Sequence, residues 1–333
     1  MARMNLSDVD VASRVLLSLL DRSRTRSGHC DSAALIHSVE RAVAADQLGY
    51  HRFWVAEHHG VPGIASGAPA VLLAAIGAHT ATIRLGSGGV MLPNHQPLIV
   101  AEQFLMLDGL YPGRIDLGLG RSLGFTEPVR RALRREKDAP DTFAADIEEV
   151  RDYLAGTAAV TARPATAGSV PIFVLATGAG LKIAAELGLP VVVGGPVLRD
   201  GDQLDAYRRD FRPSDVNPEP HVTVSLEVMV ADNTDVARAL LVSEAYALAE
   251  SSRTGVFPAL ATTAEIDAAR IGDRAARRIE AATTSALYGT PAQVQQQLHD
   301  LAAYTGADEV LASTSTYDRD ALAYSDRLLR ELI

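Results

Sequence analysis

Short apolar or β-branched runs alternate along this chain with longer amphipathic segments. The short runs are typical of buried strands, and the longer segments, with apolar residues three and four positions apart, are typical of helices. We expect strands at 15–20, 53–56, 83–92, 114–119, 172–175, 190–193, 222–230 and 309–312. Because a helix separates each strand from the next, the strands are expected to be parallel and joined by crossovers.

The expected helices cover 32–48, 69–79, 97–110, 146–154, 182–187, 202–211, 235–250, 264–282, 292–304 and 319–332. Eight strand–helix units in 333 residues favour a closed (β/α)8 TIM barrel, in a single domain over 1–333, rather than an open sheet. Thr290 before Pro291 predicts the N-cap and first residue of the helix at 292–304.

Residues 250–289 interrupt this alternation and predict an insertion in the crossover after the seventh strand. Long irregular crossovers in barrels are often mobile lids over the active face. The alternative for this insertion is a surface excursion without a role.

Composition narrows the class of protein. Hydrophobic residues make up 47% and charged residues 22%, which are globular values. With 31 Lys and Arg against 41 Asp and Glu, the net charge of −10 disfavours nucleic acid and anionic membranes as partners. The single cysteine, Cys30, excludes an intramolecular disulfide, and residues 1–14 lack the apolar core of a signal peptide. We therefore expect a cytoplasmic protein.

The barrel expectation directs attention to the residues that follow each strand, because barrel active sites lie at the carboxyl ends of the strands. These residues are Glu57–His59, Ser87–Gly89, Leu92–His95, Gly118–Ser122 and Ala176–Gly180.

A histidine in Glu57-His58-His59 can act as a proton donor or acceptor near neutral pH. Adjacent residues on an extended chain point opposite ways, so one histidine faces the barrel axis. The other packs or hydrogen-bonds behind it, where Glu57 can fix a tautomer. The alternative is a pair of loop histidines with satisfied hydrogen bonds. We predict no metal site, because neither His-Glu-x-x-His nor His-x-His occurs here and carboxylates are scarce among these strand ends.

Two glycine segments point to a phosphorylated cofactor. Gly118-Leu119-Gly120 precedes Arg121, so backbone can approach a ligand closely while a guanidinium binds its phosphate. Thr177-Gly178-Ala179-Gly180 immediately precedes an expected helix, whose first N–H groups are a natural phosphate cradle. A lone G-x-G is weak evidence, but together the segments predict a phosphorylated cofactor spanning the fourth and fifth strands.

These segments resemble one known family. Phe53–His59 (FWVAEHH), Leu85–His95 (LGSGGVMLPNH) and Tyr111–Arg121 (YPGRIDLGLGR), with Ala101–Phe104 and Leu107-Asp108 between them, are similar to bacterial luciferase-like (alkanal monooxygenase-like) flavin-dependent monooxygenases. Weaker similarity continues through Gly188–Pro190 and Gly289–Pro291 to Ala307–Glu309, so it spans nearly the whole chain in order.

The resemblance implies reduced FMN supplied by a separate flavin reductase, and O2 activation as a flavin C4a-hydroperoxide. His58 matches the catalytic histidine that stabilises the hydroperoxide, and Gly88 and Gly89 match a pair joined by a cis peptide under the flavin ring. Ser87 precedes that pair and is counted with it as cofactor-binding. Arg121 matches the phosphate-binding arginine, and Thr177, Gly178, Ala179 and Gly180 fall on the phosphate loop.

Two departures from the family pattern stand out. The phosphate loop is one residue shorter than usual and lacks the common Glu-Ser or Ser-Ser pair, which puts its detailed contacts in doubt. After the first strand the chain reads Asp21-Arg22-Ser23-Arg24-Thr25-Arg26, where close relatives carry apolar residues and proline. Basic residues there favour an anionic or oxygen-rich substrate, and the alternative is a solvated arginine loop.

By this resemblance the protein is expected to be a homodimeric monooxygenase that acts on a small organic substrate with FMN and O2. Epoxidation, hydroxylation or a Baeyer–Villiger step in the biosynthesis of aromatic polyketide antibiotics is the expected reaction. One alternative is an oxidoreductase that uses the deazaflavin F420. The other is a non-catalytic flavin-binding subunit, against which His58 and the paired glycines argue.

Overall fold

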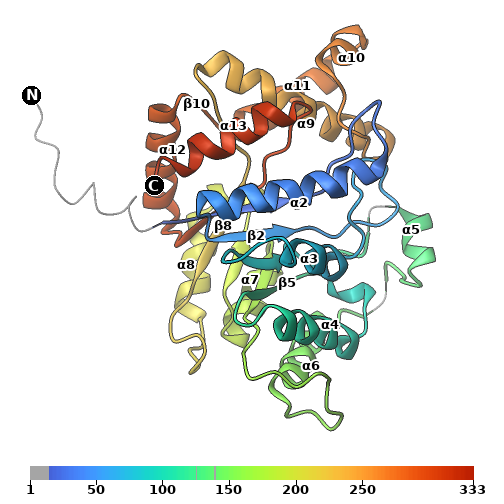
Figure 1. Ribbon diagram of the computed structural model, residues 1–333, viewed down its shortest axis with the longest axis vertical. Helices are drawn as coiled ribbons and strands as arrows, with labels where there is room; N and C mark the ends of the chain where they lie inside the picture. Colours follow the sequence, from blue (N-terminus) through green and yellow to red (C-terminus); the bar gives the residue numbers. More distant parts are fainter. Residues whose placement is uncertain (1–14, 125, 139) are drawn as a thin grey trace, which may run out of the picture. The chain divides into compact units, whose positions relative to one another are not determined.

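The computed structural model describes residues 15–333 except 125 and 139 (Figure 1). Residues 1–14, where we looked for a signal peptide, lie outside the described part. Parallel strands alternate with helices in the order of a closed eight-stranded barrel, so the predicted (β/α)8 fold is confirmed. The chain divides into two compact units. Unit 1 contains the described residues up to His51 with 61–65 and 222–333, and unit 2 contains 52–60 and 66–221.

Unit 2 is built on parallel strands in the order β2, β3, β5, β6, β7, with the short β4 also paired to β5. Its strands are β2 (Arg52–Val55), β3 (Arg84–Ser87), β4 (Val90–Met91), β5 (Ile115–Gly120), β6 (Ile172–Ala176) and β7 (Val191–Val193). Its helices are α3 (Pro69–Gly77), η1 (Leu92–Asn94), α4 (Pro97–Leu110), α5 (Glu127–Ala132), α6 (Phe143–Ala155), α7 (Ala179–Leu187), η2 (Gly195–Arg199) and α8 (Gly201–Asp210). Helices α4 and α6 pack side by side (Figure 1).

Unit 1 holds three parallel strands, with β11 between β1 and β8, and a separate parallel pair of β9 and β10. The strands are β1 (Leu16–Asp21), β8 (Val222–Leu226), β9 (Val228–Val230), β10 (Leu287–Gly289) and β11 (Glu309–Ala312). The helices are α2 (Asp31–Leu48), α9 (Thr234–Thr254), α10 (Thr263–Ala268), α11 (Asp273–Thr284), α12 (Pro291–Thr305) and α13 (Arg319–Arg330).

Burial explains why the sequence signals its strands as continuous apolar runs rather than as alternating ones. Every residue of β2, β7 and β11 is buried. Strands of a parallel sheet covered by helices are enclosed on both faces, so they do not alternate between apolar and polar residues.

A buried ionic cluster holds the starts of three strands of unit 2 together. Asp116 of β5 is fully buried and accepts hydrogen bonds from Arg52 Nη1 at 2.6 Å, Arg84 Nε at 3.1 Å and Trp54 Nε1 at 3.3 Å. These side chains lie toward the amino ends of β2, β3 and β5, the end of a barrel where conserved contacts usually serve stability. We therefore assign Asp116 to stability rather than to chemistry.

Several predicted elements are divided in the structure. The strand expected at 83–92 breaks at Gly88-Gly89 into β3 and β4, and the one at 222–230 breaks at Glu227 into β8 and β9. The single helix expected at 264–282 is two helices, α10 and α11, and Gly272 is the N-cap of α11. Strand β10 and helix α5 were not predicted. In contrast, α12 begins at Pro291 with Thr290 as its N-cap, as predicted, and Gln293 completes a capping box.

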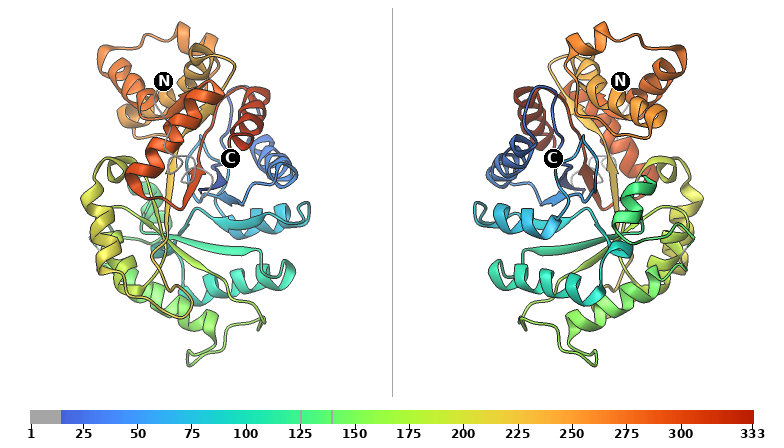
Figure 2. Two further views of the ribbon diagram at one scale, coloured as in Figure 1. Left: turned by 90° about the vertical axis from the view of Figure 1, so that its left-hand side faces the viewer. Right: turned by 90° about the vertical axis from the view of Figure 1, so that its right-hand side faces the viewer.

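The insertion at 250–289 is largely helical. Helices α10 and α11 pack against α9, and Figure 2 shows the three together, coloured gold to orange. A role as a lid stays a prediction. No helix in the described part of the chain is long and apolar enough to cross a membrane.

Candidate functional site

The segments that carry the predicted site residues follow neighbouring strands of unit 2. Val55 of β2 is in register with Ser87 of β3, and Gly120 of β5 is in register with Leu175 of β6. Because the strands are parallel, their carboxyl ends lie at one edge. The structure therefore brings together the segments after β2, β3, β5 and β6, which contain His58, Gly88-Gly89, Arg121 and Thr177–Gly180.

The peptide bond between Gly88 and Gly89 is cis, as the family resemblance implied. Gly88 N donates to the Val55 carbonyl at 2.8 Å. A Cβ atom on Gly89 would lie 2.8 Å from the Gly118 carbonyl oxygen, and one on Gly118 would lie 2.1 Å from that of Ser87. The ends of β3 and β5 thus approach each other so closely that side chains are excluded at Gly89 and Gly118.

Ser87 contributes to this close approach. It is fully buried, and its hydroxyl donates to the Gly118 carbonyl at 2.8 Å and accepts from Gly118 N at 3.1 Å. The hydroxyl therefore ties β3 to β5, and its role in cofactor binding stays a prediction.

Glu57 is the centre of a buried hydrogen-bond network at this edge. Its Oε1 atom accepts from His59 Nε2 at 2.6 Å and from His95 Nε2 at 2.7 Å, and Oε2 accepts from Met91 N at 3.0 Å. Burial alone would raise the pKa of Glu57, but the hydrogen bonds from His59 and His95 outweigh it and lower the pKa to about 2. Glu57 is therefore a carboxylate at every pH at which the protein is expected to work.

Of the two adjacent histidines, His59 is the one that Glu57 binds. His59 bonds Glu57, as we predicted for one of the two, so the alternative of a satisfied loop histidine holds for His59. His58 is half-buried, and its backbone N–H donates to the Ser66 carbonyl at 2.9 Å. The catalytic role of His58 stays a prediction.

Glu57, His59 and His95 are also the one group in the described part of the chain with ligand atoms close enough together to hold a metal ion. Two imidazole N–H groups that share one carboxylate oxygen explain this closeness without a metal. His95 ends one of the segments expected after a strand, but no role was predicted for it. Its position directly after η1, one turn beyond a predicted strand end, was the available signal.

The two expected phosphate contacts differ in their surroundings. Arg121 is exposed and forms an ion pair with Asp141. Helix α7 begins at Ala179 with Gly178 as its N-cap, at a φ of +52° that favours glycine, and the space around the position of a Gly178 Cβ is open. The N–H groups of Gly180 and Leu181 already donate to the Thr177 and Gly178 carbonyls at 3.1 Å, so an anion at this helix N-terminus would be held by the N–H groups that precede them.

The arginine-rich segment after β1 is not a solvated loop, so that alternative is wrong. Arg24 is 4% exposed and Arg26 is 7% exposed. Arg24 Nε donates to Glu244 at 2.8 Å, and its guanidinium lies 4.3 Å from the centre of the Phe257 ring. Arg26 Nε donates to the Tyr317 carbonyl at 2.8 Å. These arginines are built into unit 1.

Two acidic residues of unit 1 were not predicted as candidate site residues. Glu227 follows β8, and its Oε1 lies 3.0 Å from Arg22 Nη2; Glu244 of α9 is fully buried. Burial raises the pKa of Glu227 to about 7. The positive charge of Arg22 opposes this rise, and the negative charge of Glu244 adds to it. A charge inside the apolar run Val222–Val230 was the signal for Glu227, whereas nothing distinguishes Glu244 from a surface residue of its helix.

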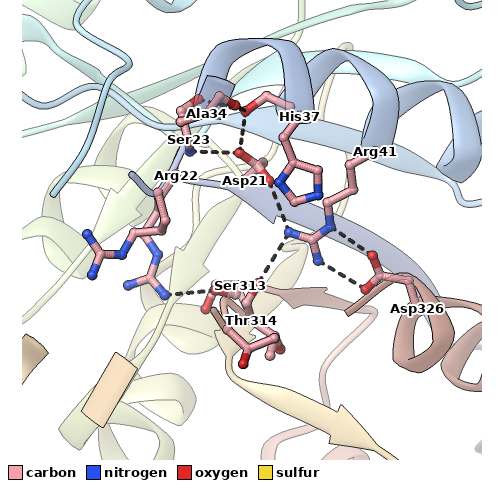
Figure 3. A network of polar contacts seen from close by, with 12 residues as sticks. Asp21, Arg22, Ser23, Ala34, His37, Arg41, Ser313, Thr314 and Asp326 are labelled. Carbon is pink, nitrogen blue, oxygen red and sulfur yellow. Dashed lines mark hydrogen bonds and ion pairs between the residues drawn. The ribbon is translucent and has the colours of Figure 1, made fainter. Parts of the chain in front are cut away.

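A second ionic network in unit 1 joins α2 to its neighbours (Figure 3). Arg41 of α2 donates to Asp326 of α13 at 2.8 Å and to Asp21 of β1 at 3.1 Å. A cavity of about 560 Å³ beside it is lined mainly by α2 and α13. Burial lowers the pKa of His37 in this cavity to about 3, so that its imidazole is neutral. The network fixes α2 against β1 and α13.

The chain is similar to known proteins over nearly its whole length. The family model described as luciferase-like monooxygenase matches residues 15–309. The chain is 36% identical to YvbT of Bacillus subtilis (strain 168), over 91% of this chain and 92% of that one. It is 34% identical to the luciferase-like monooxygenase of Escherichia coli (strain K12), over 96% and 97%. The crystal structure of apo-MsnO8 is 34% identical and matches with a TM-score of 0.86, over 96% and 98%. This chain belongs to the luciferase-like monooxygenase family.

Proposed function

We propose that this protein uses reduced FMN and O2 to insert oxygen into a small organic substrate. The observation that carries the proposal is the close approach of backbone at Gly89 and Gly118, which excludes side chains at these positions, beside the strand ends that bear His58 and Arg121. A surface without side chains at these two positions, next to a histidine and an arginine, suits a flat phosphorylated ring system.

The residues present fit FMN on two counts. No side chain fits at Gly89, because a Cβ there would lie 2.8 Å from the Gly118 carbonyl oxygen and 2.8 Å from Leu175 Cδ1. An aromatic ring can therefore lie against backbone and one leucine side chain. The loop of Thr177–Gly180 opens helix α7 with space around Gly178, and Arg121 can exchange its exposed partner Asp141 for a phosphate.

Reduced flavin, when bound, supplies the activation of O2, and the protein supplies binding, orientation and electrostatics. In our proposal the His58 imidazole hydrogen-bonds the activated oxygen. Glu57, through His59, His95 and Met91 N, holds the segment after β2 to the segment that follows the glycine pair. Arg121 and the N–H groups before α7 hold the phosphate.

The finer assignments are part of the same proposal: FMN supplied by a separate reductase, a homodimer, and epoxidation, hydroxylation or a Baeyer–Villiger reaction on an aromatic polyketide. Two names support the cofactor and the kind of reaction. A relative 28% identical over 63% of this chain is the 4-hydroxyprotoasukamycin monooxygenase of Streptomyces nodosus subsp. asukaensis. A structure with the same fold, at a TM-score of 0.72, is a type II Baeyer–Villiger monooxygenase in complex with FMN.

The variant His58→Ala tests the proposed role of His58. With photoreduced FMN bound, we expect the variant to release hydrogen peroxide faster than the wild type after mixing with O2, because the hydrogen bond to the activated oxygen is lost. His79→Ala, which changes an exposed histidine whose ring contacts the Ala75 carbonyl, is the matched control. Equal peroxide release from wild type and His58→Ala refutes the role.

The rival cofactor is F420, because a secondary alcohol dehydrogenase that depends on F420 has the same fold, at a TM-score of 0.68. Separate titrations of the protein with FMN and F420, followed by fluorescence, distinguish the two. We expect saturation by FMN at one per chain and weaker binding of F420. The reverse order would replace the oxygenase by a hydride-transfer enzyme. Oxidation of reduced FMN without an oxygenated product from any candidate substrate would instead favour a non-catalytic flavin-binding subunit.

A further inference from the structure

Arg22 reaches across the carboxyl ends of all three parallel strands of unit 1. It follows β1, its Nη2 donates to the carbonyl of Ser313 after β11 at 2.9 Å (Figure 3), and the same atom donates to Glu227 after β8 at 3.0 Å. Ligands of (β/α)8 barrels bind at this end of the strands. The side chains of Arg22 and Glu227 keep 18% and 21% of their surface exposed, so both can meet a ligand.

The other side of Arg22 is fixed by a fully buried residue. Glu244 of α9 lies 3.0 Å from Arg22 Nη1 and 2.8 Å from Arg24 Nε. The two arginines thus share Glu244, while Glu227 contacts Arg22 alone. The buried Nε–H of Arg22 has no hydrogen-bond acceptor in the described part of the chain.

The charges in this cluster balance only while Glu227 is ionised. Arg22 and Arg24 carry two positive charges, and Glu227 and Glu244 carry two negative charges. Burial raises the pKa of Glu227 to about 7, with Glu244 adding to the shift and Arg22 and Arg24 opposing it. Glu227 can therefore take up a proton near neutral pH, and the cluster then has one unbalanced positive charge on the partly exposed Arg22.

We propose that Arg22 and Glu227 bind an acidic hydroxyl group of the substrate, a phenol or an enol, with Arg22 holding the oxyanion and Glu227 taking up the proton. The O–H bond of the substrate breaks, an O–H bond forms on the Glu227 carboxylate, and the negative charge passes to the substrate oxygen. No redox partner is needed. This inference rests on the proposed function, because it names the substrate class of the proposed oxygenase.

The test uses 4-nitrophenol, which absorbs visible light only as the phenolate, with the protein free of flavin and the solution below the pKa of the free probe. We expect the phenolate band to appear on binding to the wild type. Arg22→Gln should weaken binding about tenfold or more, since a hydrogen bond to a charged group is lost. Arg253→Gln, at an exposed ion pair on α9, should bind as the wild type does.

Glu227→Gln separates proton uptake from binding, because its amide cannot accept the proton. In this variant bound phenolate should form with release of the proton to the solvent, measured near pH 7 by calorimetry in two buffers of different ionisation enthalpy. The wild type should release fewer protons, because Glu227 takes the proton up. This comparison stands even if Arg22→Gln fails to fold. As a second control, 4-nitroanisole has no acidic hydroxyl and should bind the wild type about tenfold or more weakly than 4-nitrophenol does.

Absence of the phenolate band with the wild type, equal binding of nitroanisole, or equal proton release by the wild type and Glu227→Gln would each overturn the inference. The flavin titrations do not depend on this probe. Failure of the proposed function would therefore appear in the flavin titrations, and failure of the proposed substrate class would appear in the 4-nitrophenol test.

Discussion

The variant Glu57→Gln tests the network that holds the proposed flavin edge together. Glutamine keeps the shape of the side chain but removes the charge, and it replaces one acceptor oxygen by an NH2 donor. That donor must face either the Met91 N–H or the imidazole N–H groups of His59 and His95, so at least one buried hydrogen bond becomes a contact between donors.

The size of the effect follows from the lowered pKa. The fully buried Glu57 has its pKa lowered from 4.5 to about 2, and each unit is worth about 1.4 kcal/mol. The ionised carboxylate thus contributes roughly 3 kcal/mol to the free energy of unfolding near neutral pH. Because the pKa is lower in the folded state, this contribution is complete above the unfolded-state value of about 4.3 and is lost as the pH falls toward 2.

The measurement is urea unfolding of wild type and Glu57→Gln over a range of pH. We expect a gap of roughly 3 kcal/mol near pH 7 that narrows by about 1 kcal/mol between about pH 6 and about pH 3.5. Glu149→Gln, which changes an exposed glutamate bonded to the Tyr153 hydroxyl, should stay close to the wild type. A gap below about 1 kcal/mol, or one that does not narrow in acid, would refute the account of this network.

Two further substitutions test the packing of unit 2. Asp116→Asn should lower the free energy of unfolding by about 3 kcal/mol, because the buried Arg52 loses its charged partner; a loss under about 1 kcal/mol in urea unfolding would contradict this. Gly118→Ala should cost about 3 kcal/mol or prevent folding, since its Cβ would lie 2.1 Å from the Ser87 carbonyl oxygen, whereas Gly120→Ala, with its nearest atom at 3.7 Å, should cost less than about 1 kcal/mol. Equal melting temperatures for the two glycine variants would show that the close approach of β3 and β5 is not needed.

The sequence predicted the barrel well because its signals are local. Runs such as Phe53–Ala56 and Glu309–Ala312 are apolar, bounded and too short for helices, and the structure places strands there within one residue. The cap at Thr290 is equally local, since hydroxyl, proline and Gln293 all lie within one turn. Where chain conformation depends on distant contacts, prediction failed. The break of 83–92 at Gly88-Gly89 reflects the backbone of β5, more than twenty-five residues away.

The candidate site divides in the same way. Positions after strand ends could be read directly, so His58, Arg121 and the loop before α7 were found. Hydrogen-bond partners that come from distant elements could not be predicted. Nothing in the sequence pairs His95 with Glu57, or Arg24 with Glu244 across 220 positions. The burial of Arg24 and Arg26 could not be predicted either, because an arginine-rich stretch is usually solvated. It is buried only where carboxylates and carbonyls elsewhere in the fold accept its hydrogen bonds.

Hydrogen exchange with and without reduced FMN, under anaerobic conditions, tests the central claim most directly. If one flavin is held at the carboxyl ends of β2, β3, β5 and β6, amides in 57–59, 87–91, 119–122 and 177–181 should all gain protection together and at the same FMN concentration. Protection confined to one of these segments, or found instead around the cavity between α2 and α13, would contradict the assignment of a flavin site to this edge.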